Sequence, residues 1–120
     1  MTAPLNPTQI ALQLAKLARD LDTTVQQLQV ADRDWVEKRG AFDLAYSRAF
    51  LVADGPMDVR RHLATVETHQ QRMDADVAEA LVRHLRRRID GIKVRVDVGR
   101  SYNAATRSEL ALAGAGGDGP

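Results

Sequence analysis

Small or apolar residues recur at every seventh position in the first half of the chain, in two rows that run side by side. One row holds Leu14, Leu21, Leu28, Trp35, Phe42 and Ala49, and the other holds Ile10, Leu17, Ala31, Ala45 and Val52, interrupted at Thr24 and Lys38. Two rows at this spacing form the seam of a coiled coil, which is buried only when another helix covers it. The pattern predicts an all-α protein. We expect copies of the chain to associate, with Leu14, Leu21, Leu28, Trp35 and Phe42 in the oligomer interface.

The first helix is predicted to begin near Pro7, because proline loses no hydrogen bond in a first helical turn and Asn6 or Thr8 can cap it. Residues 1–6 are then a flexible N-terminus. The β-branched run at 23–25 favours a break or a kink, whereas the row that begins at Leu14 continues through this region without interruption and favours a continuous helix. We predict one helix, with a kink as the alternative.

The segment Asp54-Gly55-Pro56 predicts a helix stop, with Gly55 in a left-handed conformation. So short a connection favours an antiparallel return, and hence an αα-hairpin. The second long helix is predicted from about Met57 to beyond Leu85. Its apolar stripe keeps a three-and-four spacing, with Gln70 at one position, and consists of Val59, Leu63, Val66, Met73, Val77, Ala80, Leu81 and Leu85.

Residues 92–98 fit two patterns. Ile92, Val94, Val96 and Val98 alternate as in a strand, but Leu85, Ile89, Ile92 and Val96 continue the helical stripe. A lone strand would leave its backbone unpaired, so we predict a helix that continues to about Leu112. The expected fold is a long-helix antiparallel coiled-coil hairpin over 7–113, with a further C-terminal helical segment and a disordered Gly-rich tail at 114–120. Whether the helices pair within one chain or between chains stays open.

Composition restricts the chemistry. The chain has no cysteine and only five aromatic residues among its 120, which suits a helical assembly better than an enzyme with a deep pocket. We find neither a secretion signal nor a stretch of about 18 apolar residues, so we expect a cytoplasmic protein without a membrane partner. A metal site on a helix would use a second histidine or a carboxylate four residues after the first ligand. Val66 and Met73 occupy those positions after His62 and His69. We expect no enzymatic activity, small-molecule substrate, metal or cofactor.

The net charge of +1 conceals an asymmetry along the sequence. Residues 1–79 carry nine basic and twelve acidic side chains, whereas 80–107 carry eight basic and only two acidic. Clustered arginines bind phosphate oxygens and release counterions from a polyanion. Alternatively, they pair with a complementary acidic stretch, Asp32, Asp34, Glu37 and Asp43, of the same chain or of a neighbour. The candidate nucleic-acid-binding residues, here called the basic segment, are Arg83, Arg86, Arg87, Arg88, Lys93, Arg95 and Arg100.

The stretch Arg88-Ile-Asp-Gly-Ile-Lys-Val-Arg95 resembles the C-terminal part of small phage recombination mediators of the UvsY type, and Arg107-Ser-Glu109 followed by Ala113-Gly114 is similar to the end of that family. The resemblance covers about the last third of the chain. It implies a ring-forming accessory protein that binds single-stranded DNA and helps a recombinase to displace single-strand-binding protein. It also implies the host cytoplasm as the location and Arg86, Arg87, Lys93 and Arg95 as the phosphate contacts. The alternative is a structural or assembly protein of a phage or prophage whose hairpin docks protein partners.

Overall fold

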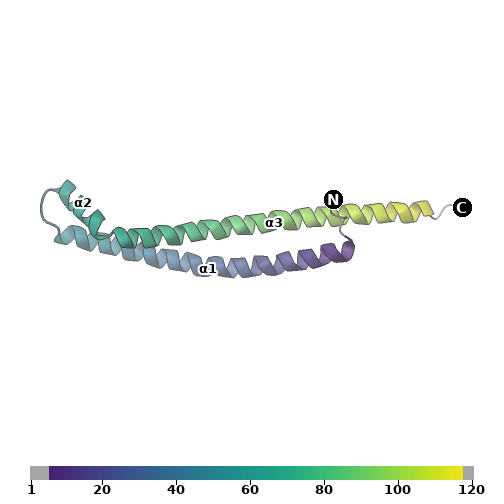
Figure 1. The fold of residues 1–120 in the computed structure, drawn as a ribbon, viewed down its shortest axis with the longest axis horizontal. Helices are drawn as coiled ribbons and strands as arrows, with labels where there is room; N and C mark the ends of the chain where they lie inside the picture. Colours follow the sequence, from purple (N-terminus) through teal and green to yellow (C-terminus); the bar gives the residue numbers. More distant parts are fainter. Residues whose placement is uncertain (1–5, 118–120) are drawn as a thin grey trace. The chain divides into compact units, whose positions relative to one another are not determined.

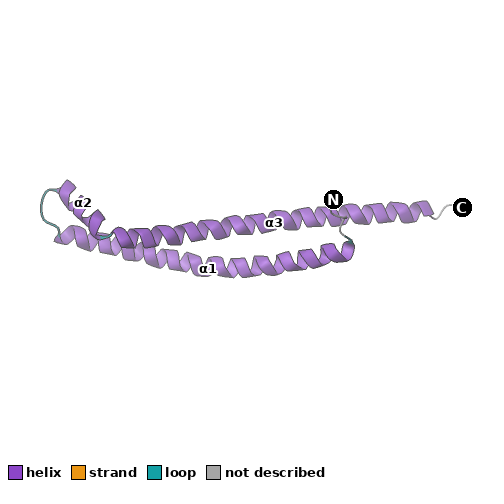
Figure 2. Cartoon of the chain, viewed as in Figure 1, coloured by secondary structure: helices purple, strands orange, loops and turns teal. Residues whose placement is uncertain are grey.

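The computed structural model describes residues 6–117, with side chains up to residue 114. This part of the chain consists of three helices, α1 (Pro7–Val52), α2 (Met57–Glu67) and α3 (His69–Gly117), and contains no strand (Figures 1 and 2). The all-α hairpin fold is therefore confirmed, and residues 92–98 are helical. The chain divides into two units, the hairpin unit (26–87) and the terminal unit (1–25 with 88–120). In each unit, a segment of α1 runs antiparallel to a segment of α3 (Figure 1).

The start and the continuity of α1 follow the sequence. Asn6 and Gln9 form a reciprocal cap, in which the Gln9 amide donates to Asn6 Oδ1 at 2.8 Å and the Asn6 amide donates to Gln9 Oε1 at 3.0 Å. The helix does not break at the β-branched run. The buried Thr24 hydroxyl donates to the Asp20 carbonyl at 2.7 Å, so its polar group is satisfied within the helix.

The turn after α1 is the predicted one. Gly55 has a φ of +111°, a conformation that residues with a Cβ atom rarely adopt. After this turn, the side chain of Arg60 in α2 contacts Phe50 near the end of α1. Its Nη2 donates to the Phe50 carbonyl at 3.0 Å, and its guanidinium carbon lies 4.4 Å from the centre of the Phe50 ring. These contacts fix the first turn of α2 against α1.

The prediction of one uninterrupted second helix is wrong, because Thr68 separates α2 from α3. Thr68 has φ −106° and ψ 17°, and it is almost completely buried. Its hydroxyl and its amide both donate to the Ala64 carbonyl, at 2.7 and 3.1 Å. A threonine side chain that bonds the carbonyl four residues back often bends a helix, and at Thr68 this bond coincides with the break. Thr24 makes the same bond within the unbroken α1, so the bond alone does not explain the break.

The seam of the hairpin unit differs from the prediction on one side. On α1, Leu28 and Trp35 pack against the buried cluster of Ala31, Val82 and Leu85, so the α1 stripe is covered by α3 of the same chain. On α2 and α3, however, most of the predicted stripe is exposed. Leu85 is the one predicted stripe residue that is buried, and the other buried positions are Ala64, Thr68, Ala75, Ala78 and Val82.

The physical reason for this shift is side-chain size. Leu28 and Trp35 are large, so α1 packs closely against a facing helix that presents mostly small residues, and interlocking large with small side chains fills a core without voids. Both stripes of the returning helices keep helical spacing, but only the alanine-rich one is small enough to face α1.

In the terminal unit, Ile10, Ile89 and Ile92 are buried. Gly99 allows the backbone of α3 to lie close to Leu14 of α1, since a Cβ atom at residue 99 would lie only 2.9 Å from Leu14 Cδ2. The alternating valines divide between the two sides of α3, with Val96 partly buried and Val94 and Val98 exposed. The alternation in the sequence thus reflects two faces of a helix.

Helix α3 continues to Gly117, beyond the predicted end at about residue 113. Residues 114–117 are therefore helical where the Gly-rich composition predicts disorder. An established helix gains one hydrogen bond for each added residue, and this explains its propagation into weak helix formers. Residues 1–5 and 118–120, which complete the predicted flexible ends, lie outside the described residues.

Candidate nucleic-acid interface

All seven residues of the basic segment lie on α3, and all are exposed. Arg83, Arg86 and Arg87 belong to the hairpin unit, whereas Arg88, Lys93, Arg95 and Arg100 belong to the terminal unit. The seam positions of α3 recur by heptads and divide these cations into rows. Lys93 and Arg100 follow Ile92 and Gly99 directly, so they occupy one flank of the seam. Arg88 and Arg95 precede Ile89 and Val96, so they occupy the other flank.

In the hairpin unit, two of the candidate arginines are engaged in ion pairs. Arg86 Nη2 lies 3.6 Å from Asp32 Oδ1 of α1, and Arg83 Nη1 lies 3.8 Å from Glu79 Oε1 one helical turn back. The pairing of Arg86 with Asp32 is one that the structural alternative predicts. These side chains are about half exposed, and such pairs contribute little to stability.

Lys38 and Asp34 form a further ion pair, within α1. Lys38 Nζ donates to Asp34 Oδ2 at 2.9 Å, and this hydrogen bond, together with the charge of Asp34, raises the pKa of Lys38. The pair keeps a cation in place at a position where the α1 seam is interrupted. It also uses one of the carboxylates that the sequence offered to the basic segment.

The terminal unit presents its cations differently. Among the described residues, no ion pair involves Arg88, Lys93, Arg95 or Arg100. The pair of Arg86 with Asp32 shows which α1 positions face this flank of α3. Because the helices are antiparallel, moving forward by one heptad on α3 corresponds to moving back by one heptad on α1. Lys93 then corresponds to Val25, and Arg100 corresponds to Ala18. The proximity of Gly99 to Leu14 agrees with this register. By this register, the α1 counterparts of Lys93 and Arg100 are uncharged, whereas that of Arg86 is a carboxylate. On α3 itself, Asp97 lies four residues after Lys93 and three before Arg100.

The opposite flank of the terminal unit combines cations with an aromatic side chain. Arg88, Arg95 and Tyr102 are seven residues apart, and 41% of Tyr102 is exposed. Tyr102 can be assigned to the same flank as Arg88 and Arg95 only because the structure shows which face of α3 is buried. The sequence signal that would have revealed both flanks is the heptad spacing of the cations relative to the valine and isoleucine stripe.

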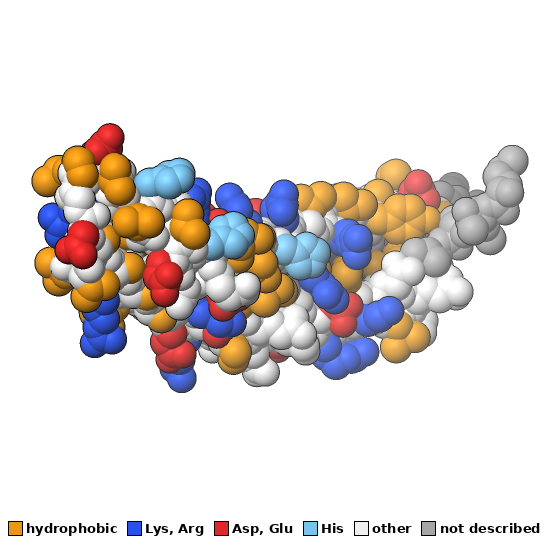
Figure 3. Space-filling model, turned by 60° about the vertical axis from the view of Figure 1, so that its left-hand side comes forward, with side chains coloured by type: hydrophobic (Ala, Val, Ile, Leu, Met, Phe, Trp, Pro, Cys, Tyr) orange, Lys and Arg blue, Asp and Glu red, His pale blue; other side chains and the backbone are white. Residues whose placement is uncertain are grey.

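Folding reduces the charge asymmetry of the linear sequence. The hairpin unit carries ten basic and ten acidic side chains, and the terminal unit carries seven basic and six acidic. Figure 3 shows acidic side chains interspersed with basic ones on the face it displays. Any attraction for a polyanion therefore depends on the local rows of cations on α3 and not on the net charge of a unit.

No protein-family model, curated protein or solved structure matches this chain. The likeness to UvsY-type mediators accordingly stays a prediction. Within the described residues, no group of three histidine or acidic side chains is placed to hold a metal ion. None of the described helices has a stretch long and apolar enough to cross a membrane.

Proposed function

We propose that this chain is a non-enzymatic helical protein that binds the backbone of single-stranded DNA along the α3 part of the terminal unit and acts as a recombination accessory. The observation that supports this proposal is the contrast between the two units. Arg86 lies 3.6 Å from a carboxylate of α1, whereas among the described residues no ion pair involves Lys93 or Arg100, whose heptad counterparts on α1 are the uncharged Val25 and Ala18. Cations that form no ion pair within the protein are available to phosphate groups.

The arrangement favours single strands without base specificity. Phosphate contacts fix a nucleic acid without reading its sequence, and bases of a single strand can stack on an exposed aromatic ring. Tyr102 supplies such a ring on the flank that carries Arg88 and Arg95. One aromatic side chain among the cations supports stacking but not a base-specific code.

The role as a mediator rests on the resemblance of residues 88–95 to UvsY-type proteins. It assigns a recombinase and a single-strand-binding protein as partners, and the cytoplasm of the host cell as the location. DNA binding is the part of this proposal that can be tested with the purified chain alone.

The experiment is a titration of a fluorescein-labelled oligonucleotide at several salt concentrations, with fluorescence anisotropy as the readout. The double variant Lys93→Gln/Arg100→Gln should bind more weakly, and the slope of log K against log salt should fall by about 0.7 for each phosphate that the variant no longer neutralises. Thymine-only and mixed sequences should bind alike. The matched control, Arg39→Gln/Arg48→Gln on α1 of the hairpin unit, removes the same charge and should bind as the parent does.

Equal weakening in both double variants would show that binding follows net charge and would refute this site. Circular dichroism of each variant verifies that the helices remain formed. Absence of binding by the parent at low salt would favour the second function, a structural or assembly protein, which the pairing of Arg86 with Asp32 supports.

A further inference from the structure

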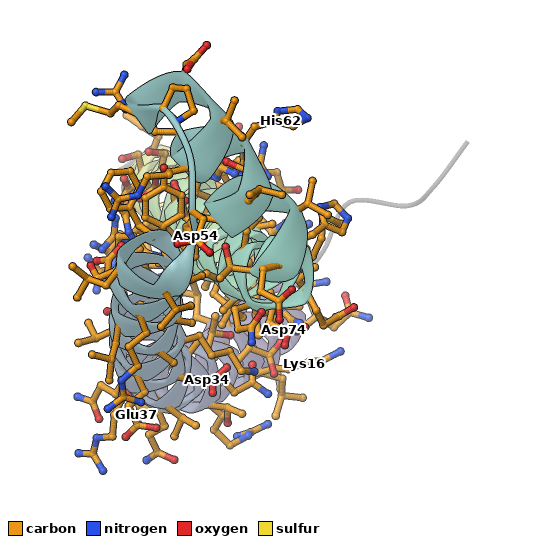
Figure 4. The ribbon with its side chains drawn as sticks, turned by 90° about the vertical axis from the view of Figure 1, so that its left-hand side faces the viewer. Lys16, Asp34, Glu37, Asp54, His62 and Asp74 are labelled. Carbon is orange, nitrogen blue, oxygen red and sulfur yellow. The ribbon has the colours of Figure 1, made fainter. Side chains whose placement is uncertain are left out.

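An apolar face of the hairpin unit lies on the side of α2 and α3 that is not buried against α1. The outer face, as we call it, includes Val59, Leu63 and Val66 of α2 and Met73, Val77 and Leu81 of α3. These six side chains are between 44% and 65% exposed. Figure 3 shows apolar side chains and histidines together on this surface, and Figure 4 shows His62 projecting from α2 away from α1.

The sizes of the side chains indicate that the outer face is a second seam. The same helices bury the small residues Ala64, Ala75 and Ala78, while their leucine, valine and methionine side chains remain exposed. The exposed side of these helices thus carries the larger apolar residues, and a contiguous exposed apolar patch marks an interaction site when it is large. Three-and-four spacing along Met73, Val77 and Ala80 gives the exposed side the pattern of a helix-pairing surface.

The exposed apolar area is large enough to matter. Six partly exposed side chains of this size present on the order of 500 Å² in one chain, and two such faces together approach the area that a specific protein interface needs. A two-fold contact doubles the buried area without requiring any other protein, because each copy contributes the same patch.

Charge complementarity along α3 identifies the occupant as a second copy. If two α3 helices cross antiparallel with the two-fold axis at Ala80, residues on the same flank meet when they lie at nearly the same distance from Ala80 on opposite sides. Asp76, four residues before Ala80, then faces Arg83 of the partner copy, three residues after it, so opposite charges meet twice on that flank. On the other flank, Val77 faces His84 of the partner copy. Parallel pairing would instead bring Asp76 against Asp76 and Arg83 against Arg83.

We propose that the outer face binds a second copy of this chain, in an antiparallel two-fold contact centred on Ala80. The small side chain of Ala80 is exposed and allows the two helix backbones to approach closely. The intrachain partners of the flanking charges do not prevent this contact. Arg72 Nε lies 3.9 Å from Asp76 Oδ2 and Arg83 Nη1 lies 3.8 Å from Glu79 Oε1, both at an exposed surface. Arg83 belongs to the basic segment, but the inference uses no residue of the terminal unit, where the DNA site is proposed, and does not depend on that function.

Cysteine crosslinking tests the position of the axis, because the chain has no cysteine of its own. A disulfide requires Cα atoms within about 7 Å of each other, which only a residue close to the axis achieves with its own copy. Under mild oxidation, the Ala80→Cys variant should form a covalent dimer. The matched control is Ser47→Cys, an equally small and exposed position on α1, which should remain mostly monomeric.

A charge exchange tests the direction of pairing. Sedimentation equilibrium should show Asp76→Arg and Arg83→Asp each weakening the dimer by about tenfold, since each change affects two symmetry-related pairs and replaces attraction by repulsion. The double variant Asp76→Arg/Arg83→Asp should regain most of the parent's affinity. Far-UV circular dichroism should be the same for all four proteins.

Three results would overturn the inference. They are a parent chain that stays monomeric at 100 µM, an Ala80→Cys variant that crosslinks no faster than Ser47→Cys, and a double exchange no better than the single changes. A failure of DNA binding leaves each of these readouts unaffected, so the two proposals fail separately.

Discussion

At the scale of single residues, local chemistry predicts the helix boundaries that depend on one or two side chains. The reciprocal cap of Asn6 with Gln9 and the positive φ of Gly55 both follow from residue types in the sequence. The break at Thr68 does not, because most threonines within helical patterns leave the helix intact. Thr24 is equally buried and bonds the carbonyl four residues back in the same way, yet α1 continues through it, so neither the residue type nor its hydrogen bond predicts where a helix breaks.

Two glycines provide a matched test of this argument. Gly55→Ala should lower the free energy of unfolding by about 1–2 kcal/mol, because a Cβ atom disfavours positive φ. Gly40→Ala should raise it by up to about 1 kcal/mol, because Gly40 lies within α1 and nothing lies within 4 Å of the added methyl group. Urea unfolding of both variants measures the two effects. The opposite order would mean that the strained turn lies elsewhere.

At the scale of elements, the spacing of apolar residues predicts long helices but cannot show which face of a helix is covered. The segment 57–85 carries two stripes at helical spacing, and the sequence favours the one with the larger side chains. The fold buries the smaller one, because Leu28 and Trp35 of α1 occupy the space between the helices. Prediction of the candidate site from the sequence has the same limit, because the sequence does not show which face of α3 is buried. The exposed cations were predictable, but their division into two flanks required the buried face of α3.

The end of α3 offers a test at this scale. Residues 107–114 are all exposed, so a chain truncated after Thr106 should keep the parent's melting temperature and lose only the helical signal of the residues removed. Truncation after Val98 serves as the control. It removes Gly99, which lies against Leu14, and should lower the melting temperature by several degrees. Thermal melts followed by circular dichroism decide the matter, and a comparable loss in both chains would show that residues 107–117 stabilise the fold.

At the scale of the whole molecule, the apolar core is small. The buried apolar residues among those described number nine, and four of them are alanine. Burying an alanine removes much less apolar surface from water than burying a leucine, so such a core provides modest stability. The larger side chains of the outer face supply what the core lacks only if a second copy covers them. Stability and association should therefore be coupled.

That coupling predicts a melting temperature that depends on protein concentration. If folding and pairing occur together, each tenfold rise in concentration stabilises the paired state by about 1.4 kcal/mol, which corresponds to several degrees for a chain of this size. Thermal melts at 1, 10 and 100 µM should show this rise for the parent. Ala80→Arg places a charge where the two helices cross, so its melting temperature should be lower and independent of concentration. A parent melting temperature that stays constant over this range would mean that the single chain is stable alone and that the outer face remains exposed to water.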